Sequence, residues 1–477
     1  MTDTICAIST PSGIGGIAVI RISGPDAIAA CSKIFRPFKA SHTLEARKTH
    51  TLTFGQIVLP KKNQETSAAD NSVKEEILDE VVISLYRAPH SFTGEDVVEI
   101  SCHGSTYIQQ QILSLLCNEK NCSNTKLSSS TNHSLSLTKW TGEGQGSGSL
   151  IRLAEPGEFT RRAFTHGRFD LSQAEAVADL ISAQSAASHR LAMQQMKGSI
   201  SQKLTSLHDQ LLELTSLLEL ELDFSEEDVE FADRTRLINL ANEIDTEVTR
   251  LADTFQSGQA IKNGIPVAII GAPNVGKSTL LNALLKEDRA IVSDIQGTTR
   301  DLIEDTITLG GYLFRFIDTA GIRTTDDRIE QLGIDRSRQA ASRANIIILL
   351  TEPGVPYIDI EARPDQHVLR IENKTDQFQA LTGLGLKALE QQLIDLATPT
   401  TSGDVILTNH RHYQALTSAH QSLLQVIAGL NANLSGDLIA EDLRTVIASL
   451  NEILGKGLTI TSQSTLNQIF SRFCIGK

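Results

Sequence analysis

The spacing of hydrophobic and polar residues changes along the chain and divides it into segments. Near the N-terminus, apolar residues alternate with others in IAVIRI (17–22), which ends at the turn residues SGP (23–25). This pattern predicts strands and short helices over residues 1–59, with a further strand at 81–86. Residues 60–76 are polar, and residues 118–149 are rich in Ser, Asn, Thr and Gly. We expect surface insertions at both places.

From Leu171 onward the apolar period becomes helical. Apolar residues recur at alternating spacings of four and three, as in helices that pack in bundles, at Ile200, Leu204, Leu207, Leu211, Leu214 and Leu218. Amphipathic patterns return at 413–430 and 437–454, and glycines end the second one. The acidic run at 226–228 indicates a solvated face. Since helical blocks flank a segment of different character, we expect a helical domain that hosts an inserted α/β domain.

Composition narrows the class of protein. The 477 residues suffice for roughly three domains. A net charge of −14 argues against a surface made for non-specific nucleic-acid binding, so any RNA contact requires a local basic patch or a partner. The 6 cysteines form no CxxC pair, which fits a reducing cytosol. No signal peptide and no apolar run near the ~18 residues of a membrane span are evident, so we expect a cytoplasmic protein.

The segment 265–279 carries the strongest chemical signal. An apolar run (265–270) leads into GAPNVGKST (271–279) and then into a helix-forming LLNALL. Glycines at 271 and 276 allow backbone N–H groups to face a polyphosphate. Lys277 would reach the β- and γ-phosphates, and the Ser278 hydroxyl would bind Mg²⁺.

Three further motifs follow this loop in the order that a GTPase requires. Thr298 and Thr299 can complete the Mg²⁺ shell, and DTAG (318–321) follows a predicted strand at 313–317. NKTD (373–376) follows a predicted strand at 368–371, and its aspartate can accept from both N–H groups of guanine, which adenine lacks. The predicted GTP-binding residues are Asn274, Val275, Gly276, Lys277, Ser278, Thr279, Ser293, Asp294, Ile295, Gln296, Gly297, Thr298, Thr299, Asp318, Thr319, Ala320, Gly321, Asn373, Lys374, Thr375 and Asp376.

Hydrolysis must be aided by a group other than the usual glutamine. Ile322 stands where Ras-like enzymes carry a water-orienting glutamine. Asn274 could bind a monovalent cation that acts in place of an arginine finger, and Glu330 could orient the water. From spacing alone, a loop-filling asparagine and a solvated helix carboxylate are equally good interpretations.

Five segments together resemble the MnmE (TrmE) family of tRNA modification GTPases along nearly the whole chain: GGIAVIRISGP (15–25), SFTGEDVVEISCHG (91–104), EPGEFTRRAFTHGRFDLSQAEAVADLI (155–181), the GTPase motifs, and FCIGK (473–477). The resemblance implies a multidomain α/β and all-α protein. Its domains would be a folate-binding and dimerising α/β domain (1–165), a helical domain in two parts (166–263 and 401–477), and an inserted doubly wound P-loop GTPase domain (264–400).

The resemblance also implies an activity and partners. The GTPase would be K⁺-stimulated and homodimeric. With the FAD-dependent partner MnmG, in a heterotetramer, it would place an aminomethyl or carboxymethylaminomethyl group on the wobble uridine of certain tRNAs. The carbon would come from 5-formyl- or methylene-tetrahydrofolate. No GxGxxG motif occurs here, so FAD is expected only in the partner.

Residues matching the family's motifs have implied roles. Folate would be bound by Arg21, Glu99, Arg168 and Lys477, K⁺ by Asn274, Ser293, Ile295 and Thr298, and Mg²⁺ by Ser278 and Thr299. Glu330 and Lys277 would be catalytic, and Cys474 is a candidate nucleophile. If the resemblance is set aside, Arg21 and Glu99 are better interpreted as an ion pair at the ends of two strands. Cys474 is then better interpreted as a small, packed hydrophobic residue. Ala272, Gln379 and the two insertions depart from the family pattern.

Two other functions remain open. A regulatory ribosome-assembly GTPase would share the GTPase motifs, but it would carry a basic RNA-binding module centred on GXXG, which is not found here. A GTPase scaffold with a degenerate folate domain is the third hypothesis, because of the two insertions.

Overall fold

The structure is a computed structural model that describes residues 3–59, 75–117, 151–223, 234–287, 305–317, 338–398, 405–456, 463–471 and 473–476. The chain forms two compact units. Unit 1 comprises Met1–Ala174 and Ile460–Lys477, and unit 2 comprises Glu175–Thr459. The domain boundaries proposed above at 165/166, 263/264 and 400/401 stay predictions.

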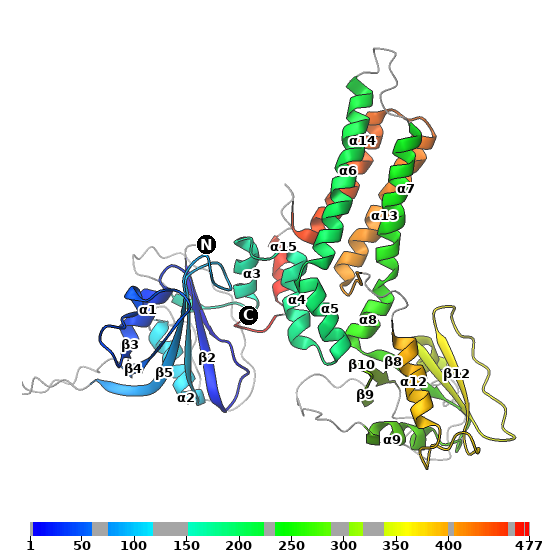
Figure 1. Ribbon diagram of the computed structural model, residues 1–477, viewed down its shortest axis with the longest axis horizontal. Helices are drawn as coiled ribbons and strands as arrows, with labels where there is room; N and C mark the ends of the chain where they lie inside the picture. The colour runs from blue at the N-terminus through cyan, green and yellow to red at the C-terminus, as the bar shows by residue number, and fades with distance from the viewer. Residues whose placement is uncertain are drawn as a thin grey trace, which may run out of the picture. The chain divides into compact units, whose positions relative to one another are not determined.

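Unit 1 is built on a seven-stranded sheet of order β3-β4-β5-β6-β2-β1-β7 (Figure 1). The strands are β1 (Thr4–Ile8), β2 (Gly15–Ser23), β3 (Phe35–Pro37), β4 (Thr51–Leu59), β5 (Glu76–Tyr86), β6 (Val97–Gly104) and β7 (Ile151–Leu153). The helical elements are α1 (Ala27–Ile34), the 3₁₀ turn η1 (Leu44–Ala46), α2 (Thr106–Leu116), α3 (Glu158–Thr165) and α15 (Gln463–Phe470). The predicted strands at 17–22 and 81–86 are present as β2 and β5.

Alternation along the central strands explains the core of unit 1. In β2, Ala18, Ile20 and Ile22 are buried and pack with residues of α1 and α2. Val19 and Arg21 point to the opposite face of the sheet, as the strand period of two requires. Arg21 pairs in register with Glu99 on β6.

A helical bundle makes up one part of unit 2. Its elements are α5 (Ala186–Met196), α6 (Ser199–Asp223), α7 (Arg234–Asp253), α8 (Phe255–Asn263), α13 (His410–Asn431) and α14 (Gly436–Leu454), and α4 (Leu171–Ser182) contains the boundary with unit 1. All six predicted seam residues of 200–218 are buried, in one core with α7, α13 and α14. The helices α6, α7, α13 and α14 lie side by side (Figure 1). As predicted, α14 ends at Gly455, which has a φ of 67°.

The second part of unit 2 is a five-stranded mixed sheet of order β12-β11-β8-β10-β9. Its elements are β8 (Ile265–Ile270), α9 (Lys277–Glu287), β9 (Asp305–Leu309), β10 (Tyr312–Phe316), β11 (Ile346–Thr351), β12 (His367–Glu372) and α12 (Leu386–Ala397). Helices α9 and α12 contribute to the core on one face, and residues 340–344 to the core on the other. Two-sided coverage and the position between α8 and α13 are consistent with an inserted GTPase domain.

Several sequence expectations fall outside the described residues. These are the acidic run 226–228, the insertion at 118–149 and most of that at 60–76. The last residue of the latter, Glu76, already belongs to β5. Within the described ranges, no helix is long and apolar enough to cross a membrane.

Candidate nucleotide and ligand sites

The nucleotide loop joins the buried strand β8 to helix α9. A Cβ atom on Gly271 would lie 2.1 Å from the Leu350 carbonyl oxygen of β11, and one on Gly276 would lie 2.4 Å from Asn373 Nδ2. Gly276 also has a φ of 98°, which L-residues rarely adopt. Both glycines are therefore required by close approach of neighbouring groups. The loop therefore packs against β11 and against Asn373, the first residue of the predicted base motif.

Lys277 is held by the loop itself. Its Nζ donates to the carbonyl oxygens of Gly271 and Ala272, at 2.8 Å in each case. Burial lowers the pKa of the Lys277 ammonium. Ser278 and Thr279 follow in the first turn of α9, at the end where the helix dipole favours anions. The arrangement places an ammonium group and a helix N-terminus around the same loop.

Asn373 connects the nucleotide loop to the loop that would face the base. Its side-chain Nδ2 donates to the Val275 carbonyl at 2.8 Å, and its Oδ1 accepts from the Ala380 N–H at 3.0 Å. Its backbone N–H donates to the Thr351 carbonyl at the end of β11. Asn373 is buried, so these bonds are shielded from water. Sequence reasoning had named Asn373 for its motif, without this structural role.

The other residues of the predicted base motif are more open. Lys374 Nζ donates to the Asn274 carbonyl at 3.3 Å and forms an ion pair with Glu352. Thr375 Oγ1 accepts from the Phe378 N–H at 3.0 Å. Asp376, which would select guanine, is exposed. The predicted base motif is therefore exposed at Lys374 and Asp376 and buried at Asn373.

Twelve predicted GTPase-domain positions lie outside the described residues: Ser293, Asp294, Ile295, Gln296, Gly297, Thr298, Thr299, Asp318, Thr319, Ala320, Gly321 and Glu330. Lys477 of the predicted folate set lies outside them as well. Of the predicted metal ligands, Asn274 on the nucleotide loop and Ser278 in the first turn of α9 belong to the described part. Within the described ranges, no three His, Cys, Asp or Glu side chains gather as a metal site would.

The predicted folate residues Arg21 and Glu99 meet in unit 1. Arg21 Nε donates to Glu99 Oε1 at 2.8 Å, and Nη1 donates to the Gly476 carbonyl at 3.4 Å. The guanidinium also lies over two aromatic rings, 5.4 Å from the centroid of Phe92 and 5.7 Å from that of Phe159. The C-terminal FCIGK segment thus reaches this pair. Sequence reasoning missed both phenylalanines, although each lies in a segment that carries the family resemblance.

Arg168 borders the same aromatic group. It is exposed and directly precedes Phe169, whose ring packs at 5.9 Å against Phe92. Cys474 is also exposed, and it follows α15 after that helix has ended. The interpretation of Cys474 as a small packed hydrophobe is therefore wrong, because the residue is exposed.

A buried charge network lies beside these residues in unit 1. Arg162 is fully buried, and its guanidinium contacts Glu95 and Glu158 at 3.1 Å and Asp3 at 3.0 Å. Glu158, also fully buried, accepts from Arg152 at 2.6 Å. Burial alone would raise the pKa of Glu158, but Arg152 and Arg162 hold it below its usual value. We name these five residues the Arg162 network.

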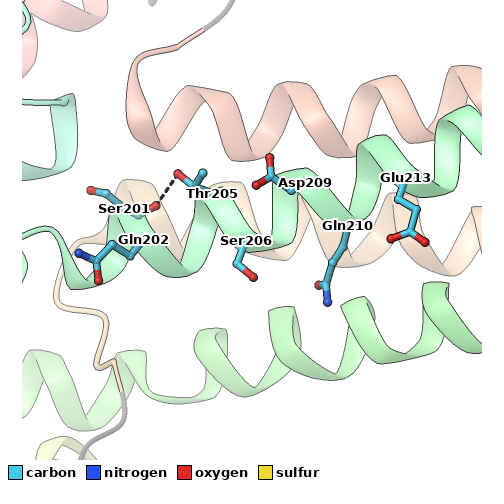
Figure 2. A pocket seen from close by; sticks show the side chains of 7 residues that line it. All are labelled: Ser201, Gln202, Thr205, Ser206, Asp209, Gln210 and Glu213. Carbon is cyan, nitrogen blue, oxygen red and sulfur yellow. Dashed lines mark hydrogen bonds between the residues drawn. The ribbon is translucent and has the colours of Figure 1, made fainter.

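A shallow groove of about 580 Å³ runs along α6 (Figure 2). The residues that line it all carry polar side chains: Ser201, Gln202, Thr205, Ser206, Asp209, Gln210 and Glu213. Thr205 Oγ1 donates to the Ser201 carbonyl of its own helix at 2.8 Å. None of the predicted site residues lines this groove. Its two carboxylates would repel the negatively charged backbone of a nucleic acid.

The strand, glycine loop and lysine-led helix, joined by Asn373 to an NKxD motif, define a phosphate-loop domain of the guanine-nucleotide-binding class. Two family models match the chain. One is described as the GTP-binding protein TrmE N-terminus and matches residues 4–168, and the other, the MnmE helical domain, matches residues 171–474.

Full-length relatives agree with both models. A protein of Parabacteroides distasonis named tRNA modification GTPase MnmE is 48% identical, with 100% of each chain covered. A protein of the same name from Bacteroides fragilis is 46% identical over 100% of this chain and 99% of its own. One from Christiangramia forsetii is 43% identical over 100% of both. The chain belongs to the MnmE (TrmE) family of tRNA modification GTPases.

Proposed function

We propose that this protein hydrolyses GTP in order to modify the wobble uridine of tRNAs. It would form the aminomethyl or carboxymethylaminomethyl group together with the FAD-dependent partner MnmG, using a folate one-carbon unit. The observation that best supports GTP use is the Asn373 side chain, which ties the NKxD motif to the phosphate loop. The name of the full-length relatives, tRNA modification GTPase, supports tRNA as the substrate.

In the nucleotide site, Lys277 would exchange its two loop carbonyls for phosphate oxygens. Hydroxyl and amide oxygens are suitable donors for the two cations. Ser278 and Thr299 would hold Mg²⁺, and Asn274, Ser293, Ile295 and Thr298 would hold K⁺. The bound K⁺ would supply positive charge near the phosphates during hydrolysis. Glu330 would orient the attacking water.

In unit 1, Arg21, Glu99, Arg168 and Lys477 would bind the tetrahydrofolate derivative. The Glu99 carboxylate can accept from the pterin N–H groups, and the arginines can pair with the folate carboxylates. The rings of Phe92 and Phe169 add an apolar surface next to these charges. Cys474 stays a candidate nucleophile, and its exposure leaves the thiol accessible.

The assembly would be a homodimer that joins MnmG in a heterotetramer in the cytoplasm, with FAD bound by MnmG alone. A ribosome-assembly GTPase is the less supported alternative, because the full-length relatives carry the tRNA-modification name.

The decisive experiment is mass spectrometry of tRNA nucleosides from cells that lack this protein. We expect the wobble-uridine modifications to disappear, to return with the unchanged gene, and to stay absent with Lys277→Ala. Lys387→Ala, which changes an exposed lysine of α12, is the matched control and should restore them. An unchanged nucleoside profile in the deleted cells would refute the proposal and favour the ribosome-assembly function.

Folate binding is tested on the purified protein with 5-formyltetrahydrofolate. We expect saturable binding that Arg168→Ala abolishes, while GTP turnover is preserved. Deletion of Lys477 should act in the same way. No saturable binding by the unchanged protein would support the degenerate-scaffold hypothesis instead.

A further inference from the structure

The hairpin formed by β9 and β10 contacts the helical part of unit 2 through its turn. Leu309 pairs with Tyr312, so the turn consists of Gly310 and Gly311, with φ values of 56° and 85°. The Gly311 carbonyl accepts a hydrogen bond from the Ala187 N–H at 2.9 Å. A Cβ atom on Gly311 would lie 3.2 Å from the Ala186 Cβ atom. The turn therefore fits closely against the start of α5.

The start of α5 is shaped to make this contact. Ser185 and Ser188 form a capping box, in which each side chain accepts from the backbone N–H of the other. Ala187 lies between them in the first helical turn, where backbone N–H groups have no partner inside the helix. Its N–H is therefore available for the hairpin. Ser185, Ala187 and Ser188 are all buried.

Helix α5 also packs, through α8, against the strand β8 that leads into the nucleotide loop. Helix α5 packs against α8 and β10, and α8 packs against both β8 and β10. Gly258 of α8 lies so close to the Leu407 carbonyl that a Cβ atom there would be 1.9 Å away. The segments entering and leaving the nucleotide-binding sheet, α8 and the residues around Leu407, are thus packed together, and α8 also contacts α5.

The two strands of this hairpin lead to different predicted parts of the nucleotide site. The residue order places Thr298 and Thr299 shortly before β9, and Asp318 directly after Ile317, which follows β10. Five-residue strands span about 17 Å from the turn to these ends. Lys277 and Asn373 follow other strands, β8 and β12. A shift of the turn would therefore act directly on the two strands that lead to the predicted γ-phosphate motifs, and would reach β8 only through its pairing with β10.

We propose that α5 positions the hairpin for GTP hydrolysis through the Ala187–Gly311 contact, which makes Ala187 and Gly311 positioning residues outside the nucleotide site. The inference rests on the proposed roles of the motifs that flank the hairpin. Because coupling between two sites is reciprocal, the nucleotide state should also alter the first turn of α5.

The first test compares Gly311→Ala with Gly354→Ala in the full-length protein. Both glycines have nearly the same φ, 85° and 84°, but a Cβ atom on Gly354 would meet no atom within 4 Å. We expect Gly311→Ala to lower kcat for GTP hydrolysis about ten- to hundredfold with little change in KM or GDP affinity. Gly354→Ala should leave all three nearly unchanged. Equal effects of the two variants would overturn the proposal.

The second test needs no substitution and so does not depend on how a variant folds. Hydrogen exchange of the Ala187 amide is compared between protein bound to GDP and protein bound to a non-hydrolysable GTP analogue. A change in protection at this amide supports the coupling, and identical exchange in the two states refutes it. If the unchanged protein does not hydrolyse GTP, or if Lys277→Ala still does, the proposed function fails instead.

Discussion

In the nucleotide loop of unit 2, the Lys277 ammonium is satisfied by two carbonyl oxygens of the loop's own backbone. In unit 1, the Arg162 guanidinium is enclosed among the side chains of Asp3, Glu95 and Glu158. Removing Lys277 leaves carbonyls that water can solvate, whereas removing Arg162 leaves the buried Glu95 carboxylate without its ion-pair partner. The first group is free to exchange its partners for a ligand, and the second holds the fold together.

The largest expected effect on stability is in unit 1. Arg162→Leu should lower the free energy of unfolding of unit 1 by about 3–5 kcal/mol, because uncompensated buried charge remains. Hydrogen exchange of the β1 and α3 amides measures unit 1 alone. The control is Arg36→Leu, which breaks the exposed Arg36–Glu75 pair and should cost less than about 1 kcal/mol. Similar losses of stability in the two variants would show that the buried Arg162 pairs stabilise unit 1 no more than the exposed Arg36–Glu75 pair does.

Lys277→Ala should show the reverse behaviour. We expect GTP hydrolysis to fall roughly 10²–10³-fold, the usual loss for one positioned donor in an active site. The free energy of unfolding should change by less than about 1 kcal/mol, since only loop carbonyls lose a donor. Steady-state kinetics and thermal unfolding of the same sample measure both. A strongly destabilised Lys277→Ala protein would show that the loop lysine is structural.

A third charged cluster, in the helical bundle, sharpens the comparison. The Glu175 carboxylate accepts from Arg411 Nε at 3.0 Å and lies 2.7 Å from His412 Nε2. Burial alone would raise the pKa of Glu175, but His412 and Arg411 outweigh it and lower the pKa from 4.5 to about 2. Because the pKa is lowered in the folded protein, its stabilisation is present above pH 4.5 and is lost as the pH falls toward 2.

Glu175→Gln should therefore destabilise the bundle by about 1.5–3 kcal/mol at neutral pH, the range for hydrogen bonds to charged groups. The difference between Glu175→Gln and the unchanged protein should shrink as the pH is lowered through the acid range. Urea unfolding at a series of pH values measures it. A difference that stays constant with pH would mean that Glu175 acts through packing.

The smallest effect concerns the cation proposed for the nucleotide loop. Hydrolysis should be roughly tenfold faster in KCl than in NaCl, which corresponds to about 1.4 kcal/mol. Asn274→Ala should remove this difference, because the side chain that would bind the cation is gone. Rates are compared at equal ionic strength, and equal rates in the two salts for the unchanged protein would defeat the proposed role.

Local patterns in the sequence predicted the elements well where one face is buried. The period of two in β2 and the alternating spacing in α6 each report a repeated environment, so neighbouring residues carry the signal. The Gly271–Lys277 loop was predicted because its glycines and lysine are dictated by backbone approach and phosphate chemistry. These parts of the fold and site need no knowledge of distant residues.

Features that depend on residues far apart in the chain could not be predicted from the sequence. Arg162 reads as an ordinary helix residue, and only the folded chain brings Glu95 to it. The contact of Ala187 with Gly311 joins positions with no shared pattern. The crossover between the parallel strands β11 and β12, residues 352–366, contains no helix, although parallel strands are usually joined by one. Each of these features depends on tertiary partners and not on local periodicity.

The Asn373 amide has a consequence for how nucleotide preference can change. One side chain hydrogen-bonds both to the predicted phosphate loop at Val275 and to the predicted base loop at Ala380, so the two predicted recognition surfaces are linked through a single residue. A substitution that re-tunes the enzyme toward another purine by moving the base loop would also disturb the grip on the phosphates. The preference for the base and the affinity for the phosphates should therefore change together. Engineering one without the other would require replacing the Asn373 amide first.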